Sequence, residues 1–336
     1  MQTEVELLEV FGNDIDKVAA SFIANYGLKY GQDESQLSDP LLRWLDFVFR
    51  YIPPVPRQIF FSNKFPKELD HDVDNALKFL ENLVLTGSDI NPYQSKGLKL
   101  QHDTSGTKRQ RRTDMLWADW GIHHLHLTTS PVAAGEYFSD RSKWLLFCVI
   151  GSDFACFVDI RDHDESNLFS DPELVTTIAE SWPEIMDRFR LKGVLAPSET
   201  RMPSEIAELR KGGVSSFITI GAQAYIGPGM GLTTASTPTR VSLAMVNINR
   251  YVRELAKIVA DPANQFRTES AASGITDPEY GIGLTERGVA VHEKYENKAF
   301  LLPRVANSQN RTFLAELHDM VAPQWALEYV LSKSEQ

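Results

Sequence analysis

The chain has 336 residues and a formal net charge of −11, and 43% of its residues are hydrophobic while 24% are charged. This composition excludes an intrinsically disordered chain, and the length favours two or three domains. The net negative charge argues against a protein whose whole surface binds nucleic acid.

No apolar run is long enough to cross a bilayer, and the first residues, MQTEVELLEVFGND, are acidic where a signal peptide would be basic and then apolar. We therefore expect a cytoplasmic protein that does not bind a membrane. The two cysteines, Cys148 and Cys156, lie in apolar strand-like segments, which predicts buried thiols in a reducing compartment. Two cysteines also exclude a four-cysteine zinc site.

The first 110 residues predict a mainly helical region that ends in a basic arm. Apolar residues recur at helical spacing in LLRWLDFVFRYI (41–52) and in DVDNALKFLENLVL (72–85). The proline-rich IPPVPRQ (52–58) separates the two segments, because proline cannot continue a helix.

The basic arm is KGLKLQHDTSGTKRQRR (96–112), which has six Lys or Arg residues against Asp103 alone, six minus one, or a local charge of +5. One interpretation is a solvated loop. The other is an RNA-facing surface made by Lys108, Arg109, Arg111 and Arg112, because such side chains bind phosphates without reading sequence.

In residues 111–200 the pattern of apolar residues changes from that of helices to that of strands. WGIHHLHL (120–127) holds three of the eight histidines, and KWLLFCVI and FACFVDI follow it, separated by a short glycine-containing connection that favours an antiparallel hairpin. Asp171 before Pro172, and Ser181 three residues before Glu184, predict two helix starts. We expect a β-meander closed by helices.

Residues 201–336 are expected to form a separate C-terminal α+β domain. A helix is predicted to start at Thr237 and Pro238, and the apolar stripe that defines its buried face is Met245, Ile248, Val252, Leu255 and Val259. The polar segment 264–286 is predicted to be a loop excursion or a linker. The loop GPGMG (227–231) lacks the Lys and Ser or Thr of a nucleotide P-loop, which favours a plain bend.

The histidine strand has two faces, because successive side chains of a strand point to opposite sides. Leu125 and Leu127 predict that their face is the core, so His123, on the same side, is expected to be a satisfied, partly buried histidine. His124 and His126 share the other face, about 7 Å apart, and are expected to face a cleft. Two imidazoles that titrate near neutrality in such a position suggest chemistry.

Three interpretations of this cluster remain open. His124, His126, Asp159 and His163 could ligate a metal ion. Alternatively, His124, His126 and His163 could act as base and acid on a phosphodiester while Arg141 and Lys143 offset the developing negative charge. The third interpretation is a set of structural histidines on a polar sheet face.

Residues 120–163, with the polar-interleaved strand GIHHLHLTT and the basic-headed hairpin RSKWLLFCVIGSDFACFVDIRDH, resemble the central sheet of RelE-type and HigB-type toxin ribonucleases. The resemblance implies metal-independent cleavage of RNA through the ribose 2′-hydroxyl, with no cofactor. His124 and His126 would match the polar positions of the first strand, Arg141 and Lys143 the basic start of the second, and His163 the end of the third. This chain departs from those small, basic domains in its length, its acidity and its long connection TTSPVAAGEYFSD.

The favoured hypothesis is therefore an α+β protein with a RelE-like central sheet that acts as a toxin-like endoribonuclease. The resemblance implies RNA as partner, including ribosome-associated mRNA or tRNA, an antitoxin protein, and a role in phage defence or a toxin–antitoxin system. The alternatives are a metal-dependent hydrolase or nuclease that uses the same histidines, and a non-catalytic protein-binding module that uses GPGMG and the C-terminal helix.

Overall fold

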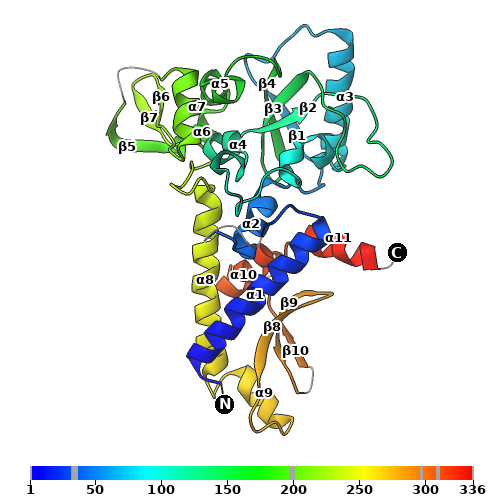
Figure 1. Cartoon of the computed structure of the whole chain (residues 1–336), viewed down its shortest axis with the longest axis vertical. Helices are drawn as coiled ribbons and strands as arrows, with labels where there is room; N and C mark the ends of the chain where they lie inside the picture. Colours follow the sequence, from blue (N-terminus) through cyan, green and yellow to red (C-terminus); the bar gives the residue numbers. More distant parts are fainter. Residues whose placement is uncertain (1, 32–36, 197–200, 296–297, 308–310, 335–336) are drawn as a thin grey trace. The chain divides into compact units, whose positions relative to one another are not determined.

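The computed structural model describes residues 2–31, 37–196, 201–295, 298–307 and 311–334. The fold is α+β, as expected (Figure 1). The chain divides into two compact units, one made of Met1–Val48 with Val241–Gln336 and the other of Phe49–Arg240. The boundaries predicted after residues 110 and 200 both fall inside the second unit, so they do not separate these two units.

The first unit combines the two ends of the chain. Its helices are α1 (Glu4–Tyr26), most of α2 (Pro40–Arg50), most of α8 (Thr239–Ala260), α9 (Gln265–Ala272), α10 (Phe313–Val321) and α11 (Gln324–Ser334), with a short 3-10 helix η5 (Val305–Asn307). Its antiparallel sheet has the order β10-β9-β8, with β8 (Tyr280–Thr285), β9 (Gly288–Glu293) and β10 (Lys298–Leu301). The segment 264–286, expected to be a linker, therefore contains α9 and β8.

Helix α1 shows how this unit is held together. Thr3 and Glu6 form a capping box at its start, and Gly27, with φ of 61°, ends it in the left-handed conformation that glycine adopts easily. The carboxylate of Asp14 accepts a hydrogen bond from the backbone N–H of Ile282 at 2.9 Å, which joins α1 to β8. On α8 the predicted stripe is buried at Ile248, Val252, Leu255 and Val259.

The second unit carries the histidine strand. Its helices are α3 (His71–Thr86), α4 (Met115–Trp120), α5 (Glu173–Ser181), α6 (Pro183–Asp187) and α7 (Pro203–Lys211), with the 3-10 helices η1 (Asn91–Tyr93), η2 (Lys96–Leu98), η3 (Arg109–Arg111) and η4 (Leu168–Ser170). Its strands are β1 (Gln58–Phe61), β2 (His123–His126), β3 (Trp144–Ile150), β4 (Phe154–Asp162), β5 (Arg190–Leu195), β6 (Ile218–Ile220) and β7 (Gln223–Tyr225).

The main sheet has the order β1-β4-β3-β2. The predicted hairpin is confirmed, since β3 and β4 pair antiparallel, and β2 pairs antiparallel with β3. Strand β1 pairs parallel with β4, although the sequence had placed QIFF in the helical N-terminal region. A smaller sheet has the order β5-β7-β6. Cys148 and Cys156 are free and buried, as expected.

Helices cover both faces of the main sheet (Figure 1). On one face Leu125, Leu127, Leu146 and Cys148 pack with apolar residues of α3. On the other face a core that includes Leu145 and Phe147 packs with residues of α4, α5 and α7. Described residues therefore cover both faces of the sheet over β2 and β3, which decides where the histidines lie. Within the described residues, no helix combines the length and the apolar character that crossing a membrane requires.

Candidate functional site

The register of the main sheet brings the predicted site residues into two adjacent rows. His124 lies opposite Phe147 and then Asp159, and His126 lies opposite Leu145 and then Arg161. Side chains paired across antiparallel strands share a face. His124 and His126 therefore lie on one face, as predicted, but it is the face that α4, α5 and α7 cover.

His124 does not face an open cleft, contrary to the expectation. Its side chain is only 12% exposed, and its ring contacts Phe169 with 5.1 Å between ring centroids. Its Nδ1 atom lies 3.5 Å from a carboxylate oxygen of Asp114, the residue that caps the start of α4. Burial lowers the pKa of His124, and Asp114 opposes that shift. Although burial alone raises the pKa of Asp114, His124, Arg50 and the other charges around the carboxyl lower it to about 2.

His126 and His163, two of the predicted residues, have neighbouring rings. Their rings stack with 6.3 Å between centroids, and His126 is 6% exposed whereas the His163 side chain is 41% exposed. Burial, followed by the charge of His124, lowers the pKa of His126 to about 4, so this imidazole is neutral at pH 7. The backbone N–H of Ser142 donates to its Nδ1 atom at 3.3 Å, which leaves the ring proton on Nε2.

The predicted cations lie beside this pair. The backbone N–H of His163 donates to the carbonyl of Lys143 at 2.7 Å, so the two residues are neighbours at the ends of β3 and β4. Lys143 and Arg141 are both exposed, and Lys143 is paired with Asp162 at 3.0 Å. The structure thus gathers His126, His163 and Lys143, with Arg141 close enough for its charge to act on His126.

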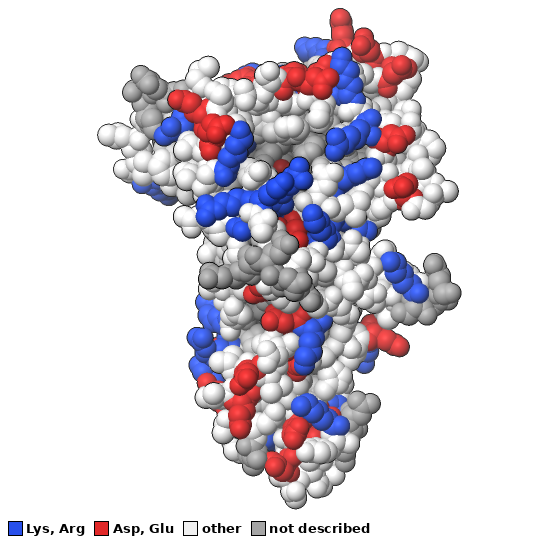
Figure 2. Space-filling model, viewed as in Figure 1, with Lys and Arg blue, Asp and Glu red and all other residues white. Residues whose placement is uncertain are grey.

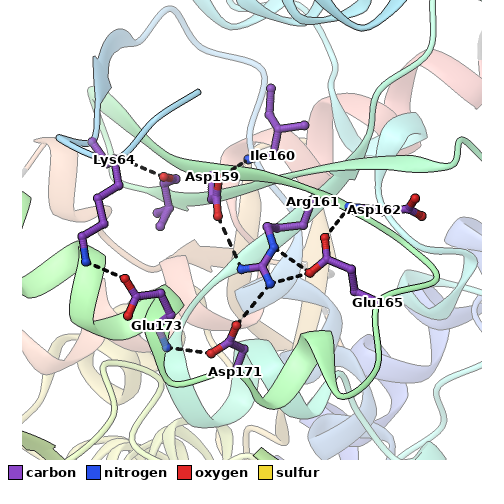
Figure 3. A network of polar contacts seen from close by, with 10 residues as sticks. Lys64, Asp159, Ile160, Arg161, Asp162, Glu165, Asp171 and Glu173 are labelled. Carbon is purple, nitrogen blue, oxygen red and sulfur yellow. Dashed lines mark hydrogen bonds and ion pairs between the residues drawn. The ribbon is translucent and has the colours of Figure 1, made fainter. Parts of the chain in front are cut away.

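The other predicted metal ligand, Asp159, belongs to an ion-pair network (Figure 3). Arg161 lies at its centre and contacts Asp159 at 3.6 Å, Glu165 through Nε at 2.8 Å and Asp171 at 3.2 Å. Hydrogen bonding to Glu165, the strongest of these interactions, raises the pKa of Arg161. Sequence reasoning missed Glu165 and Asp171, although the acidic run after β4 is a visible signal for an arginine partner.

The alternative metal set is not assembled. Across the described residues, no group of three or more His, Cys, Asp or Glu side chains is arranged so that it could hold a metal ion. Asp159 is directed to Arg161 instead, and His124 is directed to Asp114. The geometry therefore does not favour the predicted ligation by His124, His126, Asp159 and His163.

The basic arm is partly exposed and partly structural. Lys108, Arg109 and Arg111 are exposed, whereas Arg112 is 8% exposed and donates through Nε to the carbonyl of Gly106 at 2.8 Å and through Nη1 to that of Ala235. The prediction that Arg112 faces RNA is wrong, because its guanidinium holds two chain segments together. Figure 2 shows Lys and Arg side chains gathered over the face of the second unit that is turned to the viewer.

The GPGMG loop packs against the end of α4. The backbone N–H of Gly229 donates to the carbonyl of Asp119 at 3.2 Å, and that of Gly231 donates to the carbonyl of Ala118 at 3.0 Å. A Cβ at Gly229 would lie 2.3 Å from the carbonyl oxygen of Trp117, so only glycine permits this approach. These N–H groups are used by helix carbonyls and do not form a phosphate cradle, which agrees with rejecting a P-loop.

Comparison of the chain with protein-family models, with curated proteins and with solved structures gave no match. The resemblance to RelE-type and HigB-type toxins therefore stays a prediction, and function has to be argued from the side chains themselves.

Proposed function

We propose that the second unit is a metal-independent endoribonuclease and that His163 and His126 act on the phosphodiester. The observation that carries the proposal is the stacking of an exposed imidazole on a buried neutral one, with two exposed cations next to them. A phosphodiester can reach His163 from solvent. His126 then offers an N–H donor whose direction is fixed by its bond to Ser142.

The proposed reaction is a transesterification within the RNA chain. His163 accepts the proton of the ribose 2′-hydroxyl, the 2′-oxygen forms a bond to phosphorus, and the bond from phosphorus to the 5′-oxygen breaks while water supplies a proton to that oxygen. The Nε2–H of His126 and the charges of Arg141 and Lys143 stabilise the negative charge that builds on the phosphoryl oxygens. His124, whose ring contacts that of His126 and whose Nδ1 atom lies 3.5 Å from Asp114, is a positioning residue in this scheme.

The proposal extends to an RNA-binding surface and to a biological role. Exposed Lys108, Arg109 and Arg111 supply a surface for RNA phosphates. A toxin-like activity, an antitoxin partner and a role in phage defence follow from the resemblance and are part of the same proposal.

The test compares cleavage of single-stranded RNA by the wild type with cleavage by His163→Ala. We expect a loss of roughly 10²-fold or more, the usual size of a general-base contribution, with activity unchanged by a chelator. The matched control is His71→Ala, since His71 is also an exposed histidine of this unit, on α3. Equal activity of His163→Ala and the control, or complete loss of activity with chelator, would refute the proposal.

A further inference from the structure

A cavity of about 290 Å³ lies at the end of the β3 to β4 hairpin, within the second unit. Its wall is mostly aromatic and aliphatic, with a few polar groups. The lining side chains that matter here are Phe49, Tyr51, Ile150, Arg57 and His123. His123 and His124 point to opposite faces of β2, so this cavity is separate from the proposed cleavage site.

His123 is the first unsatisfied group in this cavity. It is 8% exposed, and within the described parts of the chain neither of its ring nitrogens has a hydrogen-bond partner. Burial lowers its pKa to about 3, so the ring is neutral and offers one donor and one acceptor. Neither nitrogen is among the fully buried atoms that lack a partner, so both remain accessible at the wall of the cavity, where a ligand can reach them. The expectation that His123 is satisfied in the core is therefore wrong: it is buried, but it is unpaired.

Arg57 is the second group of this cavity that has a nitrogen atom without a hydrogen-bond partner in the part of the chain that the structure describes. It is 6% exposed, and it donates through Nε to the carbonyl of Gly151 and through Nη1 to those of Pro53 and Val55. No partner of its Nη2 atom, and no carboxylate paired with its charge, occurs among the described residues. Burial lowers the pKa of the guanidinium, but an arginine remains charged in a protein. The cavity therefore has one uncompensated positive charge and no acidic side chain in its lining.

We infer that this cavity binds a single nucleotide. The phosphate is recognised by Nη2 of Arg57, and the flat base packs against Phe49 and Tyr51, as unpaired bases do on aromatic side chains. His123 hydrogen-bonds a polar edge of the base or the sugar. The volume lies at the small end of ligand cavities, about 300–1,000 Å³, so a mononucleotide suits it better than a dinucleotide cofactor.

The nucleotide can come from two sources, a free mononucleotide or an unpaired nucleotide of an RNA strand. Isothermal titration of the full chain with AMP, UMP, adenosine, inorganic phosphate and a short single-stranded RNA distinguishes them. We expect a nucleotide to bind at least tenfold more tightly than either adenosine or phosphate alone. Binding of the RNA together with AMP or UMP assigns a general nucleotide site, and binding of the RNA alone assigns the strand as the source.

His123→Leu is the decisive variant, because it replaces an unpaired buried ring with an apolar side chain and should leave the melting temperature unchanged or higher. It should weaken nucleotide binding at least tenfold. Ser152→Trp, at an exposed lining position, should block the cavity without disturbing the core. The His163→Ala variant should bind AMP and UMP as the wild type does, so failure of the cleavage proposal leaves this inference standing. Undetectable binding of AMP, UMP and RNA at millimolar concentration, or unchanged binding by His123→Leu, would overturn it.

Discussion

The ion pair of Arg210 with Asp119 offers a strong test of how the second unit is held together. The Nε atom of Arg210, on α7, lies 2.7 Å from a carboxylate oxygen of Asp119, on α4, and the two side chains are 3% and 1% exposed. The same guanidinium donates to the carbonyl of Phe169 and lies over the ring of Trp120, with 4.0 Å to the ring centroid. One side chain therefore links α7, α4 and η4.

Replacing Arg210 with Met removes the charge but keeps most of the apolar stem. The carboxylate of Asp119 then stays buried without its cation, and removing one partner of a buried pair typically lowers the free energy of unfolding by about 3–5 kcal/mol. That is a large share of the roughly 5–15 kcal/mol that stabilises a typical domain. The double variant Arg210→Met with Asp119→Leu removes both charges, so it should be more stable than Arg210→Met alone.

Urea unfolding gives the change in free energy, and hydrogen exchange measured on peptides from α4 and α7 assigns it to this unit. The control is Lys211→Met, because Lys211 follows Arg210 on α7 but forms an exposed pair with Glu208, which should contribute less than about 1 kcal/mol. A loss below about 1 kcal/mol for Arg210→Met would show that the buried pair does not stabilise the unit, and the reasoning would fail.

Two further predictions concern charge. Burial, with repulsion from Asp39, raises the pKa of Asp16 from 3.8 to about 6, so the folded chain retains this proton between these values. Stability therefore falls as the pH rises from 3.8 to about 6, and the full loss persists above about pH 6. Asp16→Asn should thus raise the free energy of unfolding at pH 7.5 by about 1 kcal/mol, after allowance for solvent screening, and leave it nearly unchanged at pH 3.5; a pH-independent effect contradicts this assignment. Replacing Lys108, Arg109 and Arg111 with Ser should reduce the slope of log affinity for single-stranded RNA against log salt by up to about 2, because each phosphate contact contributes about 0.7. The control replaces three exposed cations of α8, namely Arg250, Arg253 and Lys257. An equal change in both triple variants would assign the effect to net charge.

Local patterns predicted the elements whose partners are close in sequence. The period of two and the short connection were enough for the hairpin of β3 and β4, because its register is set by neighbouring residues. Strand β1 was missed because its partner is almost a hundred residues away, and four residues carry too little pattern to indicate a parallel pairing. The first unit was missed for the same reason, as the bond between Asp14 and Ile282 shows.

In the candidate site, too, local sequence patterns predicted some features and missed others. Alternation placed His124 and His126 on one face correctly, but the strand itself holds no information about the helices after β4 that cover this face. Arg112 shows the limit of charge patterns, because a buried arginine bonded to carbonyls and an exposed one have the same letter in the sequence. The stacking of His126 on His163 depends on the ends of two strands meeting, which the order of strands in the sheet decides.

The two histidine environments of β2 follow from one property of the strand. Adjacent residues of a strand point to opposite faces, and both faces of this sheet are covered, so His123 and His124 enter two separate interiors. His124 has the Asp114 carboxylate 3.5 Å from its Nδ1 atom, but that atom is buried and no hydrogen bond reaches it within the described residues. His123 meets an apolar cavity and a lone guanidinium, and nothing in the described chain pairs with its ring. Adjacent polar residues on a strand that is covered on both faces each need a hydrogen-bond partner on their own side of the sheet. Where the chain supplies no such partner, a ligand can supply one.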